Sequence, residues 1–111
     1  MSHPDPTRPD PRFAIGVRTA NGRAFVIPRG ELDMATTDEV AARIDALVRD
    51  GHEVVVLDLR ELTFMDSAGL RLVVEQTRSA DRQVSLIDGT EPVARLFDLT
   101  GLRPHLPFYK A

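Results

Sequence analysis

An almost unbroken apolar run over residues 53–59, EVVVLDL, constrains this chain most strongly. Its residues are mostly β-branched, which is typical of a strand. A strand without alternation of apolar and polar residues is usually buried on both faces, as in the centre of a parallel sheet. Segments with helical periodicity flank the run on both sides. We therefore expect an α/β domain in which helices connect parallel strands by right-handed crossovers.

Three helices are expected, over residues 36–50, 67–80 and 90–101. The first begins with Thr36 and Glu39, which have the Thr-x-x-Glu spacing of a capping box. The inner faces of the first two helices are predicted from side chains at helical spacing. These are Val40, Ile44, Leu47 and Val48 in the first helix, and Leu70, Val73, Val74 and Thr77 in the second.

Residues 12–30 are expected to form a β-hairpin, because two strand-like segments flank an Asn21-Gly22 turn signal. Pro28 lacks a backbone N–H and is therefore predicted at a strand end or a sheet edge. A further strand is expected over residues 83–88, and residues 60–66 are predicted to be a loop.

The predicted order is β-β-α-β-α-β-α, with a mixed sheet of four or five strands in one domain over residues 12–111. Residues 102–110 fit either a short strand or an extended tail. Residues 1–11 are rich in proline and have no apolar stretch. They are expected to be a flexible tail and not a secretion signal.

Composition excludes several classes of function. The chain of 111 residues has a formal charge of −3, and its basic residues are scattered, so binding of nucleic acid through a basic face is not expected. It contains no cysteine, which excludes disulfides, thiol catalysis and cysteine-based zinc sites. No apolar run approaches the roughly 20 residues that span a bilayer, so membrane insertion is not expected. A cytoplasmic location fits these features.

A serine lies at the junction after the central strand, in the segment Asp66-Ser67-Ala68-Gly69. It has three interpretations: a helix cap, a nucleophile, or a group that another protein modifies. As a cap, Asp66 or Ser67 would contribute about 1 kcal/mol. A cap does not explain Gly69, which costs about 1 kcal/mol relative to alanine inside a helix. Small residues here would leave the backbone accessible to something that approaches closely.

The nucleophile interpretation lacks its partners. A hydrolase elbow has glycine two residues before the serine, where this chain has Met65. A catalytic triad needs a histidine. His3 lies in the tail, His52 precedes the central strand and so belongs to the opposite end of the sheet, and His105 lies in a proline-flanked segment. No catalytic residue is therefore expected.

Binding of a phosphate group or a metal ion has no motif in this chain. Neither glycine-rich phosphate-binding pattern occurs. The acids near strand ends, Asp33, Asp58 and Asp66, have no spacing that indicates a convergent set of metal ligands. We expect no cofactor and no metal.

The modification interpretation fits the position of Ser67 better. Loops that follow the carboxyl ends of strands are where open α/β sheets present functional groups. A phosphate on Ser67 would add about 1.5 to 2 negative charges. A helix N-terminus tolerates that charge, so the fold should survive. A partner surface that faces Asp66 would not tolerate it, and a binding module would become a switch.

At these residues the chain resembles the STAS domain family, specifically the bacterial anti-sigma factor antagonists. The resemblance covers about residues 13–108. It rests on GELD at 30–33, VVLDLRELTFMDSAGL at 55–70 and VARLFDLTGL at 93–102. Many members have a second serine after the acceptor, where this chain has Ala68.

The resemblance implies an α/β fold with helices mainly on one side of a mixed sheet, and no enzymatic activity. It implies that the unphosphorylated protein binds an anti-sigma factor, itself a serine kinase, and so frees the sigma factor. The kinase then phosphorylates Ser67, binding is lost, and a PP2C-type phosphatase resets the protein. Contacts with the kinase are expected at six residues: Asp33, Asp66, Ser67, Ala68, Gly69 and Leu70.

Two other classes of function stay open from the sequence. The chain could be a non-enzymatic STAS scaffold subunit of a stress-signalling or membrane-transport complex. It could also bind a nucleotide or another small molecule at the loops of the sheet end, although no constellation of residues demands this. A monomer is expected.

Overall fold

The computed structural model describes residues 12–110, and the predicted tail over 1–11 lies outside them. The order of elements is β-β-α-β-β-α-β-α, with a 3-10 helix near the C-terminus. The strands are β1 (Ala14–Ala20), β2 (Arg23–Leu32), β3 (Val54–Asp58), β4 (Leu62–Met65) and β5 (Gln83–Ile87). The helices are α1 (Thr37–Arg49), α2 (Ser67–Arg78), α3 (Glu91–Leu99) and the 3-10 helix Arg103–His105.

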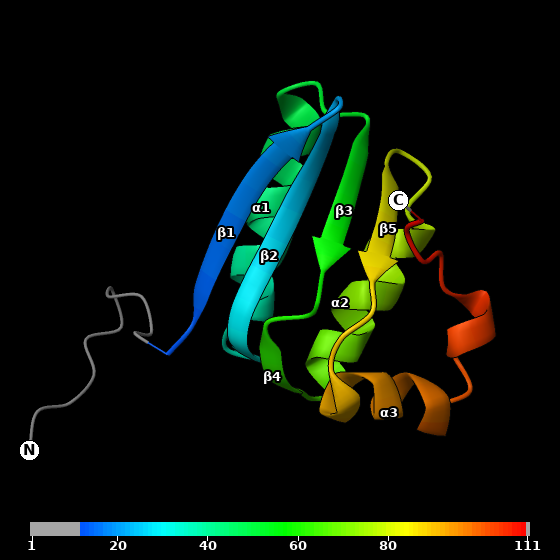
Figure 1. Ribbon diagram of the computed structural model, residues 1–111. Helices are drawn as coiled ribbons and strands as arrows, with labels where there is room; N and C mark the ends of the chain where they lie inside the picture. The colour runs from blue at the N-terminus through cyan, green and yellow to red at the C-terminus, as the bar shows by residue number, and fades with distance from the viewer. Residues whose placement is uncertain (1–11, 111) are drawn as a thin grey trace, which may run out of the picture.

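The sheet is mixed and has five strands. Its main path runs β1-β2-β3-β5, and β4 pairs with β2 beyond the end of β3. Only β1 and β2 are antiparallel to each other, which confirms the predicted hairpin; the other pairs are parallel. Helices α1 and α2 lie behind the sheet in Figure 1, and α3 lies at its lower end. The predicted fold class is confirmed.

Strand β2 changes its parallel partner part-way along its length. Residues Arg23–Val26 pair with β3, and residues Gly30–Leu32 pair with β4, with a bulge after Gly30. Gly30 has a φ of 102°, and a Cβ atom there would lie 2.1 Å from the carbonyl oxygen of Arg12. Glycine is required at this position because any side chain would be strained and would also clash.

Two predictions about this region are wrong. Residues 60–66 are not only a loop, because they contain β4. This strand is short, and its pairing with the far end of β2 cannot be read from its own residues. Pro28 lies inside β2 and is buried. It is tolerated there because it falls between the residues of β2 that pair with β3 and those that pair with β4.

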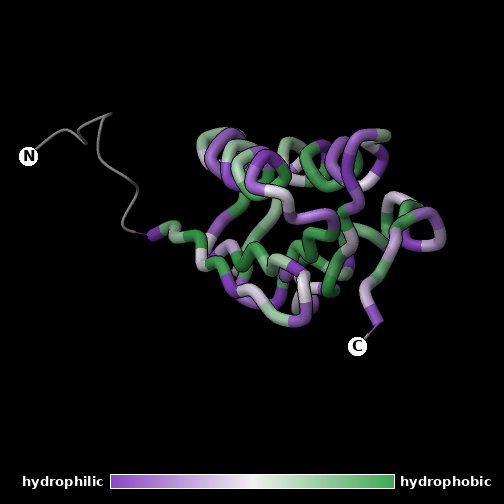
Figure 2. The backbone as a smooth tube through the Cα atoms, turned by 90° about the horizontal axis from the view of Figure 1, so that it is seen from above, coloured by the Kyte–Doolittle hydropathy of each residue, from purple (hydrophilic) through white to green (hydrophobic). Residues whose placement is uncertain are grey.

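The core lies between the helices and the sheet. Figure 2 shows the helices as one layer along one side of the strands, with hydrophobic segments in both. In α1, the buried residues are Val40, Ile44 and Leu47, as predicted, whereas Val48, which was also predicted on the inner face, is half-buried. In α2, the buried residues are Gly69, Leu72 and Val73, so the predicted inner face is wrong in part. Leu70, Val74 and Thr77 are only half-buried.

The predicted capping box at the start of α1 is also wrong. The side chain of Thr36 makes no cap hydrogen bond to the helix. Its hydroxyl instead donates to the carbonyl oxygen of Glu31, at 2.9 Å, and accepts from the N–H of Asp33, at 2.9 Å. The buried Thr36 therefore stabilises the β2–α1 loop, because it bonds to backbone groups that the turn would otherwise leave without partners.

The C-terminal segment returns to the sheet beside β5. The N–H of Leu86 donates to the carbonyl oxygen of Pro107, at 2.9 Å, and the N–H of Tyr109 donates to that of Leu86, at 2.7 Å. Phe108 forms a parallel bridge with Leu86 and packs against Phe97 with ring centroids 6.2 Å apart. Of the two predicted alternatives, the structure thus has a short strand-like pairing.

Candidate functional site

The end of the sheet where β2 and β4 terminate holds the residues of the predicted site. Helix α2 begins directly after β4, with Ser67 as its first residue. The N–H of Asp66 donates to the carbonyl oxygen of Leu32, at 3.2 Å. This bond ties the start of α2 to the end of β2. It brings the GELD segment and the Asp66-Ser67 junction together, although they are far apart in the sequence.

Asp66, and not Ser67, caps α2. The carboxylate of Asp66 accepts a hydrogen bond from the N–H of Gly69, at 3.0 Å, which satisfies one of the free donors of the first turn. Ser67 is exposed, and its hydroxyl makes no hydrogen bond to any residue in the range 12–110. The cap interpretation therefore does not account for the serine, whose hydroxyl is open to solvent.

Gly69 has a packing role. It is buried, and a Cβ atom there would lie 2.7 Å from the carbonyl oxygen of Leu32 and 2.6 Å from Cγ of Met65. Both distances are shorter than real Cβ contacts, so α2 can pack this closely against β2 only with glycine. The close approach that the small residue allows is thus made by the protein's own backbone.

Asp33 shapes the loop between β2 and α1. Its carboxylate accepts from the N–H of Ala35, at 2.9 Å, and its carbonyl oxygen accepts from the N–H groups of Thr36 and Thr37, both at 3.0 Å. The side chain is half-buried. Met34 follows it and is 80% exposed. The turn that Asp33 stabilises therefore presents a large apolar side chain to solvent.

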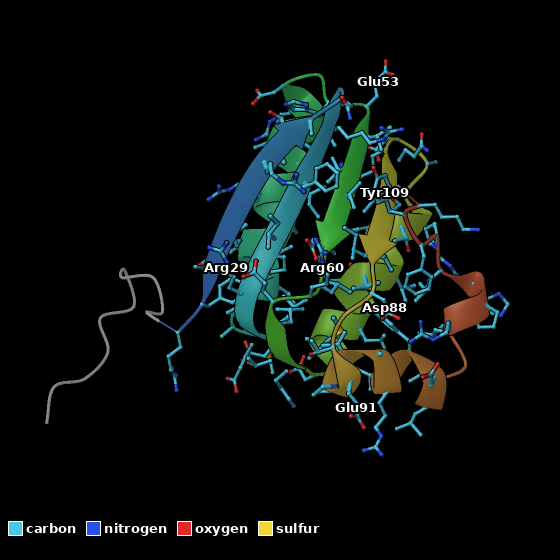
Figure 3. The ribbon with its side chains drawn as sticks, viewed as in Figure 1. Arg29, Glu53, Arg60, Asp88, Glu91 and Tyr109 are labelled. Carbon is cyan, nitrogen blue, oxygen red and sulfur yellow. The ribbon has the colours of Figure 1, made fainter. Side chains whose placement is uncertain are left out.

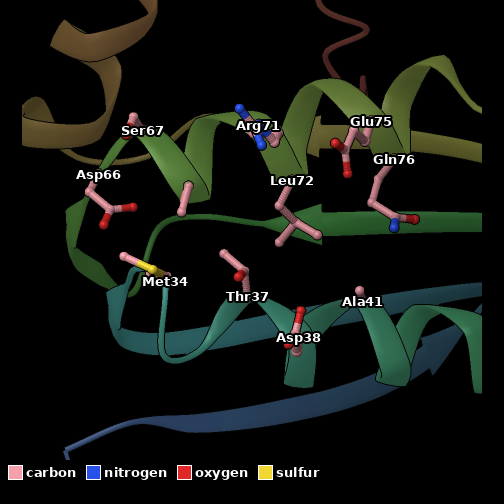
Figure 4. A pocket seen from close by; sticks show the side chains of 11 residues that line it. Met34, Thr37, Asp38, Ala41, Asp66, Ser67, Arg71, Leu72, Glu75 and Gln76 are labelled. Atoms are coloured by element: carbon pink, nitrogen blue, oxygen red, sulfur yellow. The ribbon is translucent and has the colours of Figure 1, made fainter.

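A cavity of about 540 Å³ opens between the N-terminal half of α1 and most of the length of α2. Figure 4 shows α1 and α2 facing each other across it, with Ser67 at one end and Gln76 toward the other. Its charged lining consists of three acids, Asp38, Asp66 and Glu75, and one base, Arg71. The remaining lining residues are Met34, Thr37, Ala41, Ser67, Ala68, Leu72 and Gln76.

The surroundings of Ser67 do not provide the partners of a nucleophile. Neither His52 nor His105 lines the cavity. His52 lies in the turn between α1 and β3, at the other end of the sheet, and His105 lies in the 3-10 helix after α3. Within residues 12–110, no group of three or more histidine or acidic side chains could hold a metal ion.

Asp58 is the one buried acid among the described residues. Its side chain is 4% exposed and forms a bidentate ion pair with Arg60, whose Nε and Nη2 donate to the two carboxylate oxygens at 3.0 and 2.8 Å. Burial by itself raises the pKa of Asp58. The effect of burial is opposed by hydrogen bonds from the side chain and backbone of Arg60 and by the positive charges of Arg60 and Arg18. Together these interactions hold the pKa of Asp58 below its ordinary value. Figure 3 labels Arg60 just beyond the end of β3, at the connection to β4.

Comparison with known proteins identifies the family. The family model described as STAS domain matches residues 15–111. The chain belongs to the STAS domain family. An anti-sigma F factor antagonist of Paenibacillus polymyxa is 37% identical to this STAS domain over 101 residues, which cover 86% of each chain. An anti-sigma-B factor antagonist of Staphylococcus aureus is 30% identical over 77 residues, covering 67% of this chain and 71% of the relative.

A solved structure supports the same relationship. The crystal structure of an anti-sigma factor antagonist from Mycobacterium paratuberculosis matches this STAS domain with a TM-score of 0.73 and 26% identity. The match covers 92% of this chain and 90% of that one. In the described part of this STAS domain, no helix is both long and apolar enough to cross a membrane.

The STAS domain brings the six expected contact residues to one end of the molecule, but exposes them unequally. Ser67 is exposed, Gly69 is buried, and the other four are half-buried. The residue-level predictions missed two exposed apolar side chains at the same end, Met34 and Phe64, the latter 46% exposed. Met34 could have been found, because it is an apolar residue in a polar loop directly after a strand. Phe64 could not, because its strand was not predicted.

Proposed function

We propose that this STAS domain is an anti-sigma factor antagonist that binds a serine-kinase anti-sigma factor when unmodified, and that phosphorylation of Ser67 switches binding off. One observation carries the proposal: Ser67 is exposed, its hydroxyl has no hydrogen-bond partner among the described residues, and the helix terminus that it occupies is capped by another residue. The family and the names of its relatives supply the class of partner.

The chemistry is a transfer of the γ-phosphoryl group of ATP to Oγ of Ser67, which leaves ADP and releases the hydroxyl proton. The protein itself would contribute no catalytic group. Because Asp66 already caps α2, modification of Ser67 does not remove a hydrogen bond that the helix needs. The added negative charge lies at the positive end of the helix dipole, so the modified domain should stay folded.

The binding surface would combine three exposed residues at this end of the sheet, Ser67, Met34 and Phe64, with the cavity between α1 and α2. Asp33 would act mainly by holding the loop that carries Met34. A PP2C-type phosphatase would restore the unmodified form, and the cycle would run in the cytoplasm.

The test is to incubate the purified protein with ATP and an anti-sigma factor serine kinase of the same organism, and to map phosphate by mass spectrometry. Phosphate is expected on Ser67 and absent from Ser67→Ala. Thr63→Ala is the matched control, because Thr63 is an exposed hydroxyl residue on the neighbouring strand β4. Phosphorylation of Ser67→Ala to the wild-type extent would refute Ser67 as the acceptor.

Binding gives the second arm of the test. In calorimetry, Ser67→Ala should bind the kinase persistently in the presence of ATP, and Ser67→Asp should bind at least about tenfold more weakly, because its charge faces the partner surface. Equal affinities of the two variants would contradict a phosphorylation switch. They would favour the scaffold interpretation.

A further inference from the structure

Arg71 lies one helical turn after Ser67. The two residues are four positions apart on α2 and line the same cavity. Side chains of a helix lean toward its N-terminus, so a residue four positions later covers the surface beside the earlier one. Figure 4 shows Ser67 and Arg71 projecting from the same side of α2.

The guanidinium of Arg71 has no partner within residues 12–110, where it makes no hydrogen bond or ion pair. In contrast, Arg60, Arg82 and Arg103 each form ion pairs with aspartates. The acids that share the cavity with Arg71 are Asp38 of α1, Glu75 of α2 and Asp66, whose carboxylate is already hydrogen-bonded to the N–H of Gly69.

We propose that Arg71 binds the phosphate on Ser67 and that this pairing links phosphorylation to the loss of partner binding. The proposal rests on the function proposed above and specifies how that site is regulated. A phosphate offers three strong acceptor oxygens, and a guanidinium offers a planar pair of donors that matches two of them. Positions four apart on a helix are within reach of such a pair.

The pairing changes the surface that the anti-sigma factor meets. Among the described residues, Arg71 is the only base that lines the cavity, so in the unmodified protein it is available to a carboxylate of the partner. Once Arg71 is paired with the phosphate, its guanidinium is no longer available to the partner. The excess negative charge of the phosphate then faces the same carboxylate of the partner. Both effects weaken binding, so the switch is electrostatic and depends on Arg71.

The experiment uses the full chain with phosphoserine installed at position 67 during synthesis, and it follows the second ionisation of the phosphate by phosphorus NMR. In the otherwise wild-type protein this pKa should lie below that of the Arg71→Gln variant by about 0.3 to 1 unit. Arg71→Lys should give an intermediate value. Arg78→Gln is the matched control, because Arg78 is exposed in the last turn of the same helix.

Salt provides an internal check. The difference between the wild-type and Arg71→Gln proteins should shrink in 1 M NaCl, because screening weakens an exposed ion pair. Arg78→Gln should leave the phosphate pKa at its wild-type value. If Arg71→Gln also leaves it unchanged, the proposal is overturned.

The result does not depend on any kinase. Failure to phosphorylate Ser67 enzymatically would count against the proposed function and would leave the NMR titration interpretable. Conversely, an unchanged phosphate pKa in Arg71→Gln, with Ser67 still phosphorylated by the kinase, would remove the role of Arg71 alone.

Discussion

At the scale of single residues, the residues of the segment Asp66-Ser67-Ala68-Gly69 have different roles. Asp66 caps the helix, Gly69 lets the helix pack against β2, and the hydroxyl of Ser67 makes no hydrogen bond to any of residues 12–110. Phosphorylation of Ser67, as proposed, would therefore break no hydrogen bond of the Ser67 side chain to residues 12–110. This separation is the physical basis of the proposed switch.

Replacement of Gly69 by alanine tests the packing role by the sign of its effect. Helix propensity alone would make Gly69→Ala more stable by about 1 kcal/mol. The clash with the carbonyl oxygen of Leu32 and with Met65 should reverse this and destabilise the protein by about 1 to 3 kcal/mol. Urea unfolding measures the difference, and a more stable variant would show that α2 can move away at little cost.

Asp58 makes stability depend on pH at the acid end. Because the folded protein lowers its pKa, the carboxylate contributes stability above its unfolded pKa, and this contribution is lost as the pH falls through about 4 and below. Asp58→Asn should lose about 1 to 3 kcal/mol at pH 7. Urea unfolding at pH 7 and pH 3 should show a smaller pH effect in the variant than in the wild type. An equal pH effect in both proteins would assign the acid sensitivity to other carboxylates.

At the scale of elements, the pairing of β4 with the end of β2 positions the site. Strand β4 has only four residues, yet it sets where α2 starts, since the N–H of Asp66 continues the contact with Leu32. The loop from Asp33 to Thr36 lies on the other side of the same junction and carries Met34 outward. Two short connections thus hold the two halves of the proposed binding surface.

The cap of α2 can be separated from the charge of Asp66. Asp66→Ala should cost about 1 kcal/mol and speed hydrogen exchange in the first turn of α2. Asp66→Asn should keep most of that stability, because asparagine caps equally well. Urea unfolding and hydrogen exchange check both variants. Equal losses in the two would mean that the carboxylate charge, and not the hydrogen bond to Gly69, stabilises the turn.

At the scale of the whole molecule, the C-terminal segment covers one edge of the sheet and β1 forms the other. Residues 107–109 pair with β5 through backbone hydrogen bonds. Their aromatic side chains reach both faces, because Phe108 packs against Phe97 and Tyr109 packs against Phe25 with ring centroids 5.6 Å apart. The segment therefore packs both against α3 and against the face of the sheet that the helices do not cover.

Truncation after Leu106 should lower the free energy of unfolding by about 2 to 4 kcal/mol, because it removes two backbone hydrogen bonds and two partly buried aromatic rings. Protection from hydrogen exchange should fall first in β5 and α3. Removal of Lys110 and Ala111 alone is the control and should have little effect. Wild-type stability after truncation at Leu106 would show that the contacts of the segment with the sheet contribute little to the free energy of unfolding.

The sequence by itself determined the kinds of elements, most of their order and the position of the candidate serine. Those features are local: apolar periodicity distinguishes helix from strand, and a buried strand must end before a helix can start. Only the tertiary structure decided the partner of β4, the buried face of α2 and the roles of Thr36 and Gly69. Each depends on which backbone lies opposite, and segments distant in sequence supply that backbone.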